Sequence, residues 1–106
     1  MQPIIVYCTV PDTQTGKEIA TAVVKEGLCA CVNQVPSVTS YYIYDDAFNE
    51  ESEELLIIKT DISHFEQLKN RIMELHPYEV PEIIASDITK GSKPYLQWLG
   101  DALKPL

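Results

Sequence analysis

Two residues of this 106-residue sequence, Cys8 and His76, carry side chains suited to binding a transition metal. A cysteine thiolate suits soft Cu(I), and an imidazole suits Cu(II) or zinc. Each residue also has a structural interpretation: Cys8 lies in an apolar stretch, where it can pack as a small hydrophobe, and His76 precedes Pro77, where a helix must end. Because two ligands make a weak site, metal binding is expected here only if subunits pool their ligands.

A candidate ligand cleft is suggested by Lys59, which ends an apolar run and needs a partner for its charge. It could contact an anion or another ligand between subunits. The alternatives are a structural salt bridge or an ammonium group that extends to solvent, together with ordinary core packing for the aromatic rings. The candidate cleft comprises Lys59, Tyr78, Glu79, Glu82, Tyr95 and Trp98.

The other polar clusters favour structural roles. Cys29 and Cys31 could hold Cu(I) from one face of a strand, but at a helix-to-strand joint they are expected to pack as small apolar residues. The acidic residues between 45 and 54 lack the alternating ligands and mid-loop glycine of an EF-hand, which favours a solvated turn. Neither a phosphate-binding glycine motif nor a nucleophile motif occurs, so no enzymatic activity is expected.

Composition narrows the class of protein further. The net charge of −8, from 16 acidic and 8 basic residues, repels phosphate backbones and disfavours nucleic acid as a partner. No apolar run approaches the roughly 20 residues of a membrane-spanning helix, so no membrane partner is expected. The first residues lack the basic region and cleavage site of a secretory signal, which favours a cytoplasmic location. The length predicts one domain, residues 1–106.

Hydrophobic spacing predicts four strands and three helices. The strands are expected at residues 4–10, 31–44, 53–60 and 82–88, and the helices at 15–26, 63–76 and 94–103. This β-α-β-β-α-β order with a terminal helix is that of an α+β, ferredoxin-like sandwich.

Local signals set the boundaries of these elements. Capping boxes are predicted for the first two helices, Thr15 with Glu18 and Ser63 with Glu66, and Gly27 is the predicted C-cap glycine of the first helix. Pro36 has no amide for a neighbouring strand, so it predicts a bulge or an edge. Residues 45–52 are predicted to be a polar connection between two antiparallel strands.

The strand at residues 31–44 is too long for a lone subunit. Its residues would extend about 46 Å, whereas a domain of this size is roughly 35 Å across. The overhanging end would leave an apolar edge uncovered, which closed cyclic assembly would cover. The expected interface residues are Tyr41, Tyr42, Ile43 and Tyr44. The alternative is that Pro36 breaks the strand into two pieces that fit a monomer.

An ordered set of motifs covers nearly the whole chain. Ile57-Ile58-Lys59-Thr60 precedes a helix, and the segment His76-Pro77-Tyr78-Glu79-Val80-Pro81-Glu82-Ile83-Ile84 follows it, with Tyr95-Leu96-Gln97-Trp98 beyond. Upstream stand Thr9-Val10-Pro11 and Ala30-Cys31-Val32-Asn33, then Pro36 and Ser40. In order and spacing these motifs resemble the CutA family, although Ile43-Tyr44-Asp45-Asp46-Ala47 departs from the usual aromatic pair and glycine near the hairpin tip.

The resemblance implies a ferredoxin-like subunit in a cytoplasmic homotrimer without established catalytic activity. It also implies a link to tolerance of copper and other divalent ions, and a likeness to PII-type signalling trimers. The leading hypothesis is therefore a trimeric protein of divalent-metal response that requires no cofactor and binds copper, another divalent cation or a small ligand between subunits. The alternatives are a PII-like sensor of a small anionic metabolite and a non-catalytic assembly scaffold.

Overall fold

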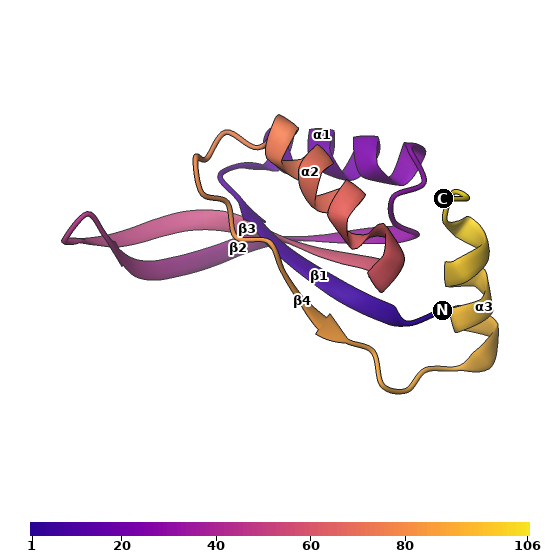
Figure 1. Cartoon of the computed structure of the whole chain (residues 1–106). Helices are drawn as coiled ribbons and strands as arrows, with labels where there is room; N and C mark the ends of the chain where they lie inside the picture. The colour runs from indigo at the N-terminus through magenta and orange to yellow at the C-terminus, as the bar shows by residue number, and fades with distance from the viewer.

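The computed structural model describes all residues 1–106 as a four-stranded sheet with helices (Figure 1). Its elements, in chain order, are β1 Pro3–Val10, α1 Thr13–Lys25, β2 Cys31–Tyr44, β3 Ala47–Asp61, the 3-10 helix η1 Ile62–His64, α2 Phe65–Leu75, β4 Ile84–Asp87 and α3 Lys93–Ala102. The strand order is β2-β3-β1-β4, and every neighbouring pair is antiparallel. The predicted α+β class and element order are confirmed. No helix is long and apolar enough to cross a membrane.

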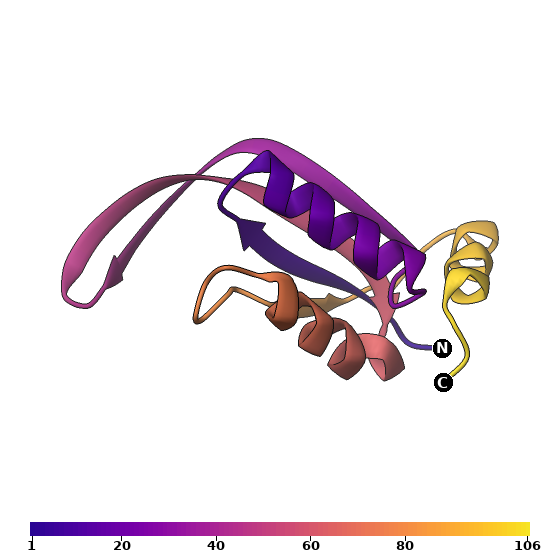
Figure 2. The ribbon, with the colours of Figure 1, turned by 90° about the horizontal axis from the view of Figure 1, so that it is seen from above.

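Helices α1 and α2 lie side by side on one face of the sheet, and α3 lies at one end of it (Figures 1 and 2). The core forms between these layers because alternate residues of β1 point toward the helices and are buried. Each helix buries an apolar stripe against them. The core comprises Ile4, Val6, Cys8, Val10, Ile19, Val23, Leu28, Cys29, Leu56, Ile58, Leu68 and Ile72.

Aspartates rather than the predicted hydroxyl residues cap the first two helical segments. Asp12 caps α1, where its Oδ1 accepts a 2.7 Å hydrogen bond from the Thr15 amide. Asp61 caps η1 and accepts from the His64 amide, while Ser63 donates its hydroxyl to the same carboxylate. The predicted Thr15 and Ser63 caps are therefore wrong, because a charged acceptor lies three residues before Thr15 and two residues before Ser63.

Gly27 ends α1 as predicted. Its φ of +70° lies in the left-handed region that favours glycine, and a Cβ there would lie 2.8 Å from the Lys104 Cβ. The Gly27 carbonyl accepts a 2.9 Å hydrogen bond from the Lys104 amide. This turn therefore ends the helix and also holds the C-terminal segment.

The β2–β3 hairpin projects from the body of the subunit as a twisted two-stranded arm (Figures 1 and 2). The chain measures 44 × 26 × 21 Å along its principal axes, so it is elongated. The turn is only Asp45 and Asp46, both with positive φ, and pairing resumes at Tyr44↔Ala47. The predicted polar connection 45–52 is therefore wrong beyond residue 46, because ladder hydrogen bonds do not require apolar side chains on an exposed ribbon.

A β-bulge bends β2 at the predicted place. Val35 pairs with Leu55, whereas Val38 pairs with Glu53, so β2 carries one extra residue around Pro36. Ser37 takes a φ of +63° there. Pro36 thus interrupts the ladder without breaking the strand into two separate elements.

The last strand and the last helix lie close to their predicted positions. Strand β4 is shorter than the predicted 82–88, because its ladder with β1 begins only at Ile84 opposite Tyr7. The residues before it cross toward the base of the hairpin instead of pairing. Helix α3 begins with Ser92 as its cap and buries Leu99.

Candidate functional site

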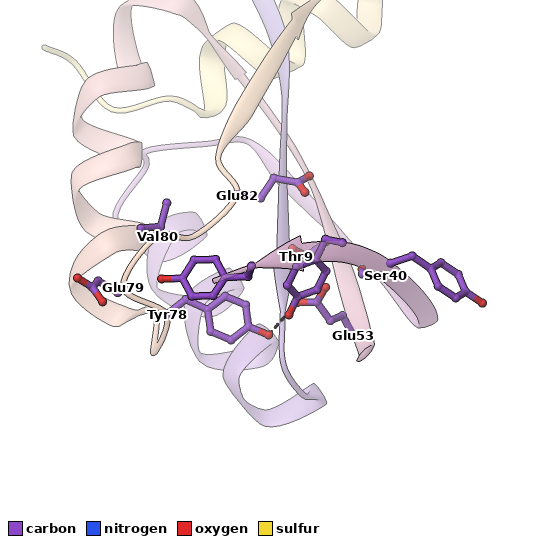
Figure 3. Close-up of a pocket in the computed structure, with 10 residues that line it drawn as sticks. Thr9, Ser40, Glu53, Tyr78, Glu79, Val80 and Glu82 are labelled. Carbon is purple, nitrogen blue, oxygen red and sulfur yellow. Dashed lines mark hydrogen bonds between the residues drawn. The ribbon is translucent and has the colours of Figure 1, made fainter. Parts of the chain in front are cut away.

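A pocket of about 610 Å³ opens at the base of the hairpin arm, where β2 and β3 meet the segment between α2 and β4 (Figure 3). It is rich in tyrosine and glutamate, and it contains no lysine, arginine or histidine. Its lining residues are Thr9, Ser40, Tyr41, Tyr42, Tyr44, Glu53, Tyr78, Glu79, Val80 and Glu82.

Glu53 and Tyr78 form the polar contact of this pocket. The Tyr78 hydroxyl donates a 2.7 Å hydrogen bond to Oε2 of Glu53 (Figure 3). Glu53 is only 6% exposed, and it forms no salt bridge. Burial and the neighbouring Glu53 raise the pKa of Tyr78, so its hydroxyl stays protonated as the donor.

His76 positions Tyr78 through both of its ring nitrogens. Nε2 lies 2.8 Å from the Thr9 carbonyl oxygen, which can only accept, so this nitrogen carries the proton. Nδ1 then accepts from the Tyr78 amide at 3.1 Å, and the two rings lie 4.7 Å apart between centroids. The ladder between β4 and β1 ends at Tyr7. Beyond it, the Thr9 carbonyl of β1 is bonded by the His76 side chain instead of by a strand.

Cys8 is fully buried under the helices. Burial first, and then the charges of Glu82 and Glu53, raise the pKa of the Cys8 thiol to about 12. The thiolate that Cu(I) prefers is therefore unfavourable at neutral pH. In the subunit no group of three or more His, Cys, Asp or Glu side chains is arranged to hold a metal ion. A site at Cys8 and His76 would require these arrangements to change.

The other cysteines lie at the joint between α1 and β2. Cys29 is buried, and burial raises the pKa of its thiol to about 12. Cys31 is half-buried at the start of β2. This placement fits packing rather than a paired Cu(I) site.

The predicted ligand cleft is only partly assembled within one subunit. Tyr78, Glu79 and Glu82 line the pocket. Lys59 lies elsewhere, in the middle of the sheet opposite Ile5 and Cys31, and it forms no salt bridge. Within this chain Lys59 therefore does not line the pocket.

Tyr95 and Trp98, the remaining cleft residues, pack on each other in α3, with ring centroids 5.5 Å apart. Helix α3 lies at the end of the sheet away from the hairpin (Figure 1). Within one subunit these two rings therefore do not reach the pocket at the base of the arm.

Sequence reasoning missed the buried member of the site, Glu53. The predicted strand 53–60 includes Glu53, but the residue was also counted among the acidic residues of a solvated turn, whereas it is buried on β3 at the base of the arm. Its position just before the apolar run 55–58 was the available signal, because a glutamate at the start of a buried strand needs a local partner.

The hairpin arm exposes a group of large apolar side chains. Ile43 is 74% exposed and Phe48 is 69% exposed. Tyr41, Tyr42 and Tyr44 are also exposed, and Tyr41 packs on Phe48 across the strands. The subunit alone does not cover these residues.

Comparisons with known proteins agree across sequence and structure. A family model described as "CutA1 divalent ion tolerance protein" matches residues 4–102. The divalent-cation tolerance protein CutA of Thermus thermophilus is 46% identical over 95 residues, which make up 90% of this chain and 92% of that protein. The crystal structure of CutA1 from Oryza sativa superposes with a TM-score of 0.96 at 40% identity, covering 98% of this chain and 95% of that one.

Some relatives are longer. The chloroplastic protein CutA of Arabidopsis thaliana is 46% identical over 101 residues, which are 95% of this chain and 56% of that protein. The chain thus spans just over half the length of that relative. A similar structure is that of CutA from Archaeoglobus fulgidus, described as periplasmic, with a TM-score of 0.93 and 26% identity over 96% of this chain and 99% of that one.

Proposed function

The chain belongs to the CutA1 divalent ion tolerance family, and on that basis we propose that it works as a non-catalytic homotrimer that binds a ligand at clefts between its subunits. The observation that carries this proposal is the hairpin arm, whose exposed tyrosines, Ile43 and Phe48 would be unstable in water without a covering surface.

The two edges of the sheet support a cyclic assembly. Strand β2 forms one edge, β4 forms the other, and each carries unpaired backbone groups along its outer side. The side chains of β4 are exposed throughout, including Ile84. Because the two edges differ, an edge-to-edge contact between copies is head-to-tail, and such contacts form a closed ring when the rotation from copy to copy closes. The arm of one subunit would then lie against its neighbour.

The metal function of the proposal rests on the family, whose members are named for tolerance of divalent cations. Copper or another divalent cation would bind where subunits pool donors, because one subunit offers no group of three ligating side chains. Cys8 and His76 remain the proposed donors. Metal binding would have to expose the buried Cys8 thiol and replace the hydrogen bonds that both ring nitrogens of His76 form. A sensor of an anionic metabolite would need Lys59 from a second subunit, because the pocket of one subunit contains carboxylates and no cationic side chain.

A cytoplasmic location stays a prediction. The relatives include proteins described as chloroplastic and as periplasmic, so the family occurs in more than one compartment.

Light scattering and copper titration test this proposal separately. Light scattering at micromolar concentration should give about three times the 12.0 kDa chain mass, and a stable monomer would contradict the trimer. Titration with Cu(II) and Cu(I) should then be compared between the parent chain and a Cys8→Ala, His76→Ala double variant. Equal copper binding by both proteins would show that these two residues are not the ligands. If neither protein binds metal or ligand, the assembly-scaffold alternative is favoured.

A further inference from the structure

We propose that the pocket at the base of the hairpin arm binds a small organic ammonium ion, with Glu53 as its counter-charge and the tyrosines as its walls. This inference rests on the proposed function, because it names a ligand class for a cleft that a neighbouring subunit would border. No positively charged side chain lines the pocket.

The first observation is the unsatisfied charge of Glu53. Its carboxylate is buried, and a buried carboxylate is costly unless a cation or several donors compensate it. It has one donor, the Tyr78 hydroxyl on Oε2, and its Oε1 accepts no hydrogen bond within the subunit. No buried oxygen is fully enclosed without a partner, so Oε1 retains access to the pocket space. A cation in the pocket would supply the missing partner.

The second observation is the aromatic lining. The Tyr78 hydroxyl contacts Glu53 directly, and Tyr41, Tyr42 and Tyr44 line the hairpin side of the pocket. Tyrosine rings attract cations with their faces, and the attraction grows when the cation is removed from water. Alkylated ammonium ions lose little hydration on entering such a site, so they suit a wall of tyrosines with one carboxylate.

The third observation separates an organic cation from a metal ion. Glu53, Glu79 and Glu82 all line the pocket, yet no three acidic, histidine or cysteine side chains converge at metal-binding distance. A hard divalent cation needs several oxygen ligands around it. The volume of about 610 Å³ is also far larger than a single ion requires and lies within the range of small-molecule sites.

The test is a calorimetric titration with choline, its neutral isostere 3,3-dimethylbutan-1-ol, and MgCl₂ at constant ionic strength. We expect saturable binding of choline at least about tenfold tighter than binding of the isostere, and no competition from Mg²⁺. The variant Glu53→Gln should weaken choline binding about tenfold or more, because it removes the charge but keeps an acceptor for Tyr78. The control Glu18→Gln removes the same charge from the exposed face of α1 and should bind choline as the parent does.

Two results would overturn the inference: equal affinity for choline and its neutral isostere, or unchanged choline binding by Glu53→Gln. A third result would be that the parent protein does not bind choline and that Glu53→Gln no longer assembles. A cationic side chain of a neighbouring subunit would then be the partner of Glu53 in the pocket. Light scattering on the same samples keeps the two proposals distinct. A trimer that does not bind choline contradicts only the proposed ligand of the pocket. A monomer that binds choline contradicts only the proposed trimer.

Discussion

The imidazole of His64 and the carboxylate of Asp61 form a buried pair, with His64 Nδ1 2.6 Å from Asp61 Oδ1. On the other side of the ring, Nε2 lies 2.7 Å from the carbonyl oxygen of Lys104. Both neighbours are acceptors, so the geometry calls for a proton on each ring nitrogen. The pair therefore links the start of α2 to the segment that follows α3.

Acid should weaken the fold through Asp61. Burial raises the pKa of this carboxyl, but hydrogen bonds from the side chains of His64 and Ser63 and from the His64 amide together lower it below its usual value. A carboxyl whose folded pKa is depressed contributes stability above its unfolded pKa and loses it as pH falls. We therefore expect the free energy of unfolding to decline as pH drops below about 4, measured by urea titration at a series of pH values.

The variant Asp61→Asn provides the comparison for this pH series. It should be less stable than the parent near neutral pH and should show a smaller decline in acid, because it has no carboxylate to protonate. An equal slope in both proteins would assign the acid sensitivity to other carboxyls.

Replacement of His76 should destabilise the base of the arm. His76→Phe leaves the Thr9 carbonyl without its donor and the Tyr78 amide without its acceptor, and an unmet buried group costs about 1–3 kcal/mol. Urea denaturation should show this loss, and His76→Gln, which has one donor and one acceptor, should lose less. If His76→Phe were as stable as the parent, water would have to satisfy the Thr9 carbonyl and the Tyr78 amide in place of the imidazole.

Thiol reactivity should distinguish the three cysteines. Cys8 and Cys29 are buried, and burial raises the pKa of each to about 12, so very little thiolate forms at pH 8. A chromogenic disulfide reagent should therefore react with Cys31 alone in the folded protein and with all three cysteines in denaturant. Cys31→Ser should abolish the native reaction. Rapid native reaction of a second thiol would contradict the burial of Cys8 or Cys29.

A charge on the hairpin arm should break the proposed trimer. Tyr42→Asp would bury an unpaired carboxylate in the subunit interface, which we expect to give a monomer or insoluble protein. Light scattering and the soluble yield report the outcome. Met73→Asp is the matched control, because Met73 is also a large exposed apolar residue but belongs to α2 and not to the arm. A soluble trimer of Tyr42→Asp would remove this side chain from the interface.

The sequence was sufficient for the fold because strong, local signals agreed with one another. Pro36 marked the bulge, Gly27 ended a helix and Pro77 marked the end of another. Caps were less predictable, because Asp12 and Asp61 compete with nearby hydroxyl residues and only geometry decides which acceptor lies at the right turn.

The site was harder to predict than the fold, because pockets depend on contacts between distant segments. Tyr78 and Glu53 are 25 residues apart, and nothing in the local pattern of either indicates the other. Lys59 and Trp98 were grouped with Tyr78 because a lysine at the end of an apolar run and aromatic rings suit a ligand cleft, but their local patterns do not reveal that they lie in different parts of one subunit.

The extra residue that β2 carries near Pro36 determines which side chains of the outer hairpin point to each side of the ribbon. Side chains alternate along a strand, so one inserted residue exchanges odd and even positions between the two sides of the ribbon. Tyr42 consequently shares a side with Glu53 rather than with Leu56 and the core. If the same residues paired without this bulge, Val38 would lie opposite Ser52, and Tyr41 and Ile43 would take the side of the ribbon on which Tyr42 and Tyr44 now stand.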